Sequence, residues 1–386
     1  MTNPLLQLAA AGQSVWLDYI HRRILADGEL KRLIEQDGVT GVTSNPSIFE
    51  QAIGQGTDYD DPLRKLLEEG VEKPAELYER LAIADVQAAA DQLRPVYDRL
   101  QRRDGYVSLE VSPHLAMDGE ATVTEARRLW HTVNRPNVMI KVPGTGPGAA
   151  AVRQLISDGI NINVTLLFGI DAYLAFAEAH LVGLEALRAQ GGDVSKVHSV
   201  ASFFISRIDT AIDEAIDRRL AAGAGADTDD LKTLRGKVAI ANAKIAYRRY
   251  RETIETPRWQ NLAAAGAAPQ RLLWASTGMK DPAYADVHYV ESLIGPDTVN
   301  TMPAKTMDAF RNHGHVGPTL REHPSEAYEI EVLTDQLGLD LKAVTDALVI
   351  EGVRKFATSY DALAAALTAK RARLLPGGPL EPSACH

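Results

Sequence analysis

Short apolar, β-branched segments alternate along this chain with longer helical patterns, and this alternation constrains the fold most. Helical spacing of apolar residues fills stretches such as 75–100 and 204–222. Strands that alternate with helices indicate parallel βαβ units. Eight segments read as buried strands: SVWLDY (14–19), GVTGVTS (38–44), YVSLEVS (106–112), NVMIKV (137–142), INVTLLF (162–168), KVHSVASFF (196–204), RLLWAS (271–276) and TVNTMP (298–303). Eight such units predict an α/β fold, a (β/α)8 TIM barrel with additional helices and its active site at the carboxyl ends of the strands.

A doubly wound open sheet is the alternative, because periodicity does not distinguish a closed sheet from an open one. No G-x-G-x-x-G follows the first strand, which weakens the dinucleotide-binding version of that fold. The 386 residues exceed a typical barrel of about 250. We expect one domain over 1–386, with helical insertions near 46–105 and 223–270 and a C-terminal helix, 341–375, that packs across the barrel mouth.

Net charge, the length of the apolar runs and the cysteine count argue against several classes of protein. A net charge of −10 argues against nucleic acid as the main partner, yet a few cations in a cleft suffice for a phosphorylated small molecule. No apolar run approaches the length of a membrane span. The only cysteine, Cys385, cannot form an internal disulfide, and the N-terminus has no secretion signal pattern. We expect a cytoplasmic protein; its oligomeric state stays open, a homodimer included.

Lys141 stands near the end of the apolar run NVMIKV. Burying a charged amine is unfavourable, and a lysine that loses its proton becomes a nucleophile. The structural alternative is that its stem lies on apolar surface while its amine reaches water.

Polar residues stand at the ends of the other predicted strands as well. Each has an ordinary structural explanation: Asp18 as a turn cap, Asn45 before Pro46 as a helix entry, Glu110 in an ion pair, or Arg207 on a solvated helix. Together they would face one barrel mouth. The set is Asp18, Asn45, Glu110, Lys141, Asn163, Thr165, Ser202, Arg207, Ser276 and Lys280.

A lysine among carboxylates indicates Schiff-base catalysis. The iminium formed with a ketone withdraws electrons, so that a neighbouring C–C bond can break once a base removes a hydroxyl proton. Two carboxylates in different environments can divide the acid and base roles. The pair His313 and His315 prompts a metal site, but the ligand spacing is weak, and we expect neither metal nor cofactor.

Seven motifs, in this order, resemble those of the transaldolases of the pentose phosphate pathway, in their longer bacterial branch: SVWLDYI, GVTSNPSIF, SLEVSP, MIKVPGT, GININVTLLF, SFFISRID and WASTGMKDPAY. Transaldolases are class I aldolases on a (β/α)8 barrel. The resemblance implies transfer of dihydroxyacetone from sedoheptulose 7-phosphate to glyceraldehyde 3-phosphate, with erythrose 4-phosphate and fructose 6-phosphate as products.

The resemblance also implies roles for individual residues. Lys141 matches the Schiff-base lysine, and Asp18 matches the acid/base at the substrate's C4 hydroxyl. Glu110 and Thr165 match the pair that holds a catalytic water. Asn45 and Ser202 match residues that contact the dihydroxyacetone unit. Arg207 and Ser276 match residues that hold the substrate phosphate.

Two positions bear on substrate choice. The best-known branch has an arginine where Gly278 stands, and Lys280 is the candidate to replace its charge. Phe204 falls where the related fructose 6-phosphate aldolases carry a tyrosine, which favours transfer over release of free dihydroxyacetone. An aldolase of that kind, or a sugar-phosphate-binding barrel without catalysis, are the alternatives.

Overall fold

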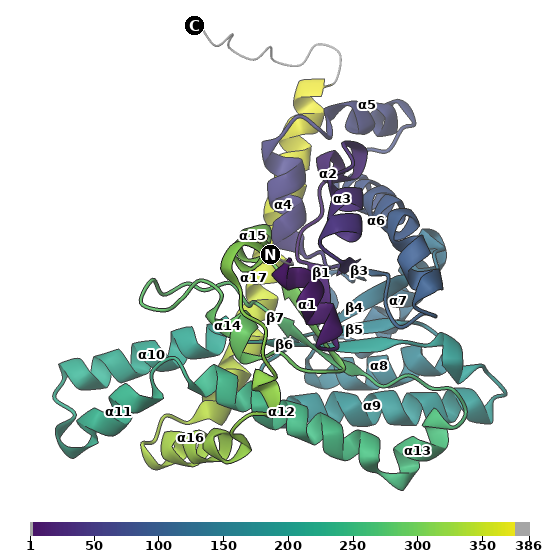
Figure 1. Ribbon diagram of the computed structural model, residues 1–386. Coiled ribbons are helices and arrows are strands. Elements are labelled where there is room, and N and C mark those ends of the chain that lie inside the picture. Colours follow the sequence, from purple (N-terminus) through teal and green to yellow (C-terminus); the bar gives the residue numbers. More distant parts are fainter. Residues whose placement is uncertain (1–2, 375–386) are drawn as a thin grey trace, which may run out of the picture.

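The computed structural model describes residues 3–374 (Figure 1). Cys385 and the last position of the expected helix 341–375 lie outside these residues. Eight parallel strands pair in chain order, and β8 closes on β1. The strands are β1 (Gln13–Leu17), β2 (Val39–Val42), β3 (Tyr106–Glu110), β4 (Val138–Pro143), β5 (Ile162–Leu167), β6 (Ser199–Phe204), β7 (Arg271–Ala275) and β8 (Thr298–Met302). The closed barrel confirms the predicted fold class, and the doubly wound alternative is wrong.

The strands are buried on both faces. Six of the eight are buried at every position. Continuous burial is typical of parallel strands, whose inner faces fill the barrel while helices cover their outer faces. All eight predicted segments contain the observed strand or overlap it within a few residues.

Helices surround this barrel, and several stand well away from it (Figure 1). They are α1 (Pro4–Ala10), α2 (Arg22–Ala26), α3 (Glu29–Gln36), α4 (Pro46–Gln55), α5 (Asp60–Glu68), α6 (Pro74–Arg99), α7 (Gly119–Val133), α8 (Gly146–Ser157), α9 (Ile170–Ala189), α10 (Ser206–Ala221), α11 (Thr228–Leu234), α12 (Val238–Glu255), α13 (Pro257–Ala263), α14 (His288–Ser292), α15 (Ala304–His313), α16 (Pro324–Gln336) and α17 (Leu341–Leu374).

The expected insertions correspond to helices in the structure. Residues 46–105 contain α4, α5 and α6, and residues 223–270 contain α11, α12 and α13. The long helix α17 lies beside α4 and contacts β5 (Figure 1). That the whole chain forms a single domain stays a prediction.

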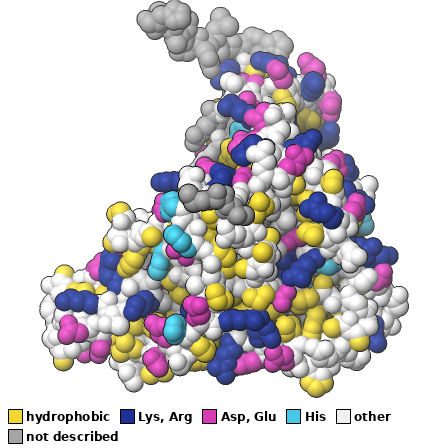
Figure 2. Space-filling model, viewed as in Figure 1, with side chains coloured by type: hydrophobic (Ala, Val, Ile, Leu, Met, Phe, Trp, Pro, Cys, Tyr) yellow, Lys and Arg dark blue, Asp and Glu magenta, His cyan; other side chains and the backbone are white. Residues whose placement is uncertain are grey.

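The surface carries mixed charge. Lys and Arg side chains are interspersed with Asp and Glu on the face shown in Figure 2. This arrangement differs from the continuous basic face typical of nucleic-acid-binding domains. Among residues 3–374, no helix is long and apolar enough to cross a membrane.

Candidate active site

A cavity of about 400 Å³ opens at the carboxyl ends of the barrel strands. This volume falls in the range of small-molecule sites. Ten residues have a catalytic or substrate-binding role in the predictions above, and nine of them line this cavity: Asp18, Asn45, Lys141, Thr165, Ser202, Phe204, Arg207, Ser276 and Lys280. The tenth, Glu110, pairs in register with Lys141 on the neighbouring strand. One cavity therefore brings together residues spread over more than 260 positions of sequence.

Lys141 lies inside the cavity wall with 4% of its surface exposed. Its Nζ donates a hydrogen bond to the carbonyl oxygen of Ser44 at 2.9 Å and lies 3.6 Å from Oε2 of Glu110. A lysine whose amine reaches bulk water would not be buried to this degree, so the structural alternative for Lys141 is wrong. A buried amine beside a carboxylate and facing a cavity is suited to nucleophilic attack on a bound carbonyl.

Glu110 is a buried acid with unused hydrogen-bonding capacity. Burial raises its pKa to about 7, while the neighbouring Lys141 ammonium opposes this shift. Within the described part of the chain, neither carboxylate oxygen of Glu110 accepts a hydrogen bond, and Oγ1 of buried Thr165 has no partner. Buried polar atoms normally have partners. Glu110, 3.6 Å from the amine, and Thr165, in the cavity wall, can therefore each bind a water or a substrate hydroxyl.

Asp18 follows the end of β1 and is held by a threonine pair. Thr43 donates its Oγ1 hydrogen to Asp18 Oδ1 at 2.7 Å, and the Oγ1 atoms of Thr43 and Thr301 are also 2.7 Å apart. Burial raises the pKa of Asp18, whereas Lys141, the Thr43 hydrogen bond and Arg207 act in the opposite direction. An oriented carboxylate with a raised pKa is suited to exchanging protons with a substrate.

Asn45 has a structural and a functional role at once. Its Oδ1 accepts the backbone N–H of Ile48 at 3.0 Å and so caps α4. The cap uses the oxygen, so the amide hydrogens are the donors available to a ligand in the cavity. The helix-entry reading of Asn45 is confirmed, and it fixes this side chain at the cavity wall.

Ser202 is oriented by a chain of buried side chains. It donates to Asn163 Oδ1 at 2.7 Å, and Asn163 Nδ2 donates to Ser108 Oγ at 2.9 Å. This network spans β6, β5 and β3 inside the barrel. Because its hydrogen is used in this bond, the Ser202 hydroxyl can only accept from a ligand.

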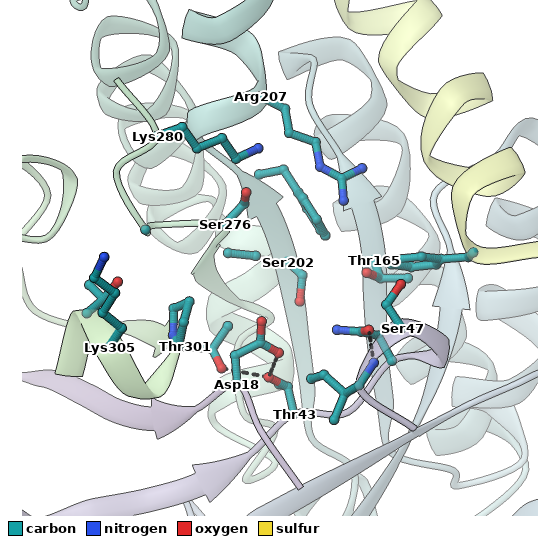
Figure 3. A pocket seen from close by; sticks show the side chains of 18 of the residues that line it. Asp18, Thr43, Ser47, Thr165, Ser202, Arg207, Ser276, Lys280, Thr301 and Lys305 are labelled. Carbon is teal, nitrogen blue, oxygen red and sulfur yellow. Dashed lines mark hydrogen bonds between the residues drawn. The ribbon is translucent and has the colours of Figure 1, made fainter. Parts of the chain in front are cut away.

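Cations gather at the other end of the cavity. Figure 3 shows Arg207 and Lys280 on one side, Asp18 and Thr43 on the other, and Ser202 and Ser276 between them. Ser276 has a left-handed φ of 56°, and its Oγ lies 2.9 Å from Ser206 Oγ. Burial lowers the pKa of Lys280, and the charges of Arg207 and Lys355 lower it further. Cations that repel one another in this way are stabilised by an anionic ligand bound between them.

Gly278 lines the cavity close to the start of α15. A Cβ atom there would lie 3.2 Å from Thr306 Oγ1 and 3.6 Å from Pro303 Cγ. A side chain at this position would therefore require the Thr306 hydroxyl to shift slightly. Lys280, two residues further on, lines the same cavity. Its role as the replacement cation stays a prediction.

Sequence reasoning missed other residues of the cavity wall, among them Ser47, Thr301, Lys305 and Phe356. Thr301 carried the same signal as the others, since it lies near the end of a predicted strand. Phe356 carried none, because it is one apolar residue of a long helix. The pair His313 and His315 faces carboxylates, with His313 Nε2 2.8 Å from Asp286. Within residues 3–374 no group of three metal-binding side chains forms.

Comparisons of this chain with a family model and with individual proteins agree with one another. A family model described as Transaldolase/Fructose-6-phosphate aldolase matches residues 15–367. Transaldolase 2 of Nostoc sp. is 48% identical over 382 residues, covering 97% of this chain and 99% of that protein. The transaldolase of Thermobifida fusca is 46% identical over 364 residues, covering 94% and 97%. That of Trichodesmium erythraeum is 44% identical over 383 residues, covering 97% and 100%.

Proposed function

This chain belongs to the transaldolase/fructose-6-phosphate aldolase family, and we propose that it transfers a dihydroxyacetone unit between sugar phosphates through a Schiff base on Lys141. It is an enzyme, a transaldolase, and its relatives of that name match it along nearly the whole chain. Its reaction belongs to the pentose phosphate pathway. The proposed donor is sedoheptulose 7-phosphate and the proposed acceptor glyceraldehyde 3-phosphate. A cytoplasmic location and a homodimer stay predictions.

One observation carries the proposal: the buried Lys141 amine, 3.6 Å from the Glu110 carboxylate, in the same cavity as Asp18. The amine attacks the ketone carbon. Glu110 and Thr165 hold the water that moves protons while the carbinolamine loses its hydroxyl as water. A barrel that only binds sugar phosphates has no need of a buried amine between two carboxylates.

The second half of the proposed reaction depends on Asp18. The iminium draws electrons from the C3–C4 bond, Asp18 takes the proton of the C4 hydroxyl, and the aldehyde leaves. An enamine stays on Lys141 until the acceptor aldehyde binds. Its carbon then attacks the aldehyde, Asp18 returns the proton to the new hydroxyl, and hydrolysis frees the product. Asn45 and Ser202 hold the hydroxyls of the dihydroxyacetone unit throughout.

Trapping with borohydride tests this proposal directly. Incubation with fructose 6-phosphate and sodium borohydride should leave a reduced dihydroxyacetone adduct, which peptide mass spectrometry should locate on Lys141. A folded protein that forms no adduct would favour a sugar-phosphate-binding barrel. Release of dihydroxyacetone at the rate of transfer would favour the fructose 6-phosphate aldolase alternative, against which Phe204 argues.

Removing the Arg207 guanidinium should weaken the use of phosphorylated substrates. We expect Arg207→Ala to lower kcat/KM for fructose 6-phosphate by about 10- to 100-fold, the range of a hydrogen bond to a charged group. Lys280→Ala should have a smaller effect, since an ammonium lacks the planar fork of arginine. Reaction with unphosphorylated fructose should change little. Lys232→Ala, an exposed lysine on α11, is the control. Equal losses on both sugars would mean that Arg207 does not bind phosphate.

The pH dependence of the first half-reaction should follow Glu110. Its pKa of about 7 lies above the ordinary value of 4.5. Below pH 7 the carboxylate is protonated and cannot receive the proton that leaves the amine nitrogen. The second-order rate constant of the first half-reaction, measured in single turnovers, should therefore fall about tenfold per pH unit below this pKa. Glu110→Gln should be slower and should lose this acid limb. An unchanged limb in the variant would assign it to another group.

A further inference from the structure

Helix α17 contributes one residue, Phe356, to the described wall of the active-site cavity. The ring is 4% exposed, and its centroid lies 6.0 Å from Lys141 Nζ. Lys141 and Thr165 line the same cavity and are buried as well. The aromatic ring therefore lies near the Lys141 nitrogen on the side that α17 faces, in the same cavity as Thr165.

Close packing fixes the position of α17 at the barrel mouth. Gly352 lies one helical turn before Phe356, on the same face of the helix. A Cβ atom at Gly352 would lie 2.8 Å from Cδ2 of Leu166 on β5, so glycine permits this close approach. On the other side of Phe356, Ser359 Oγ lies 2.8 Å from Ser47 Oγ of α4. The ring is thus held over the cavity by contacts before and after it along the helix.

This arrangement has a consequence for the enamine. Once the first aldehyde has left, the enamine carbon either attacks an acceptor or takes a proton. Protonation gives an iminium, water adds to its carbon, and the C–N bond breaks to release dihydroxyacetone and the Lys141 amine. Release therefore requires a proton donor and one water, whereas transfer requires neither until the acceptor has reacted. A side chain that excludes bulk water favours transfer.

We propose that Phe356, held by the Gly352 contact with Leu166, is a specificity residue that sets the ratio of release to transfer. The proposal rests on the Schiff-base function proposed above. Its action comes from filling space: the ring excludes bulk water from the side of Lys141 that α17 faces, and the single water held by Glu110 and Thr165 stays in place. No other side chain of α17 in the described chain reaches the cavity.

The ratio itself is the readout. Release is measured as dihydroxyacetone formed from fructose 6-phosphate without acceptor, and transfer as the rate with erythrose 4-phosphate. We expect Phe356→Ala to raise the release-to-transfer ratio by about tenfold, and Phe356→Leu, which refills most of the volume, to stay within about threefold of the unsubstituted enzyme. Ile350→Ala is the control, because Ile350 is 74% exposed on the same helix. Its ratio should not change.

A second variant covers the case in which Phe356→Ala does not fold, as judged by circular dichroism. Gly352→Ala adds one methyl group 2.8 Å from Cδ2 of Leu166, so the Leu166 side chain or α17 has to shift, and we expect the ratio to rise. Borohydride trapping on every variant separates the two proposals. No adduct in the unsubstituted enzyme would refute the Schiff-base function. An adduct on Lys141 in folded variants whose ratio is unchanged would refute the role of Phe356 alone.

Discussion

Lys141→Arg should abolish turnover, by on the order of 10⁵-fold or more, because a guanidinium stays protonated and cannot form a Schiff base. Arginine keeps the positive charge beside Glu110, so the buried ion pair is retained in kind. The variant should therefore fold, and its thermal unfolding should stay close to that of the unsubstituted protein. Loss of activity with a retained fold would identify the amine as the nucleophile.

The measurement combines steady-state kinetics with borohydride trapping. Lys342→Arg is the matched control, because Lys342 pairs with Asp346 at 2.7 Å on an exposed part of α17. The control should keep full activity and the adduct. In Lys141→Arg, an adduct that persists on another lysine, with measurable turnover, would contradict the assignment.

Much of the barrel could be predicted because its determinants are local. Continuous apolar runs such as NVMIKV and RLLWAS lie in β4 and β7, and the helical spacing of 75–100 and 204–222 lies in α6 and α10. Closure of the sheet could not be predicted in this way. It depends on the pairing of β8 with β1, for example of Thr298 with Gln13, and local periodicity contains no information on so distant a contact.

The candidate site shows the same division. Residues at strand ends were predictable, because the carboxyl ends of parallel strands meet at one face. Three features depend on tertiary structure. The acceptor for the Lys141 amine is a backbone carbonyl, that of Ser44, which no residue type reveals. The crowding of Gly278 comes from α15, and the position of Phe356 comes from the path of α17.

Asp18→Asn should slow cleavage of the C–C bond by about 10²- to 10⁴-fold, the usual contribution of a general acid/base. Asparagine has nearly the same shape, and its Oδ1 can still accept the 2.7 Å hydrogen bond from Thr43. The carboxylate that takes the C4 hydroxyl proton is then missing. Lys141, Glu110 and Thr165 are unchanged, so the ketose should still form its Schiff base.

The trapped species distinguishes this step from the earlier ones. In the unsubstituted enzyme, borohydride should reduce a three-carbon adduct on Lys141, because cleavage precedes trapping. In Asp18→Asn the adduct should retain the whole six-carbon sugar phosphate, since the bond does not break in time. Asp361→Asn, at a carboxylate that pairs with His114 on the surface, should give the three-carbon adduct. A three-carbon adduct formed by Asp18→Asn at the normal rate would assign proton removal to a group other than Asp18, and Glu110 would be the nearest remaining carboxylate to the amine.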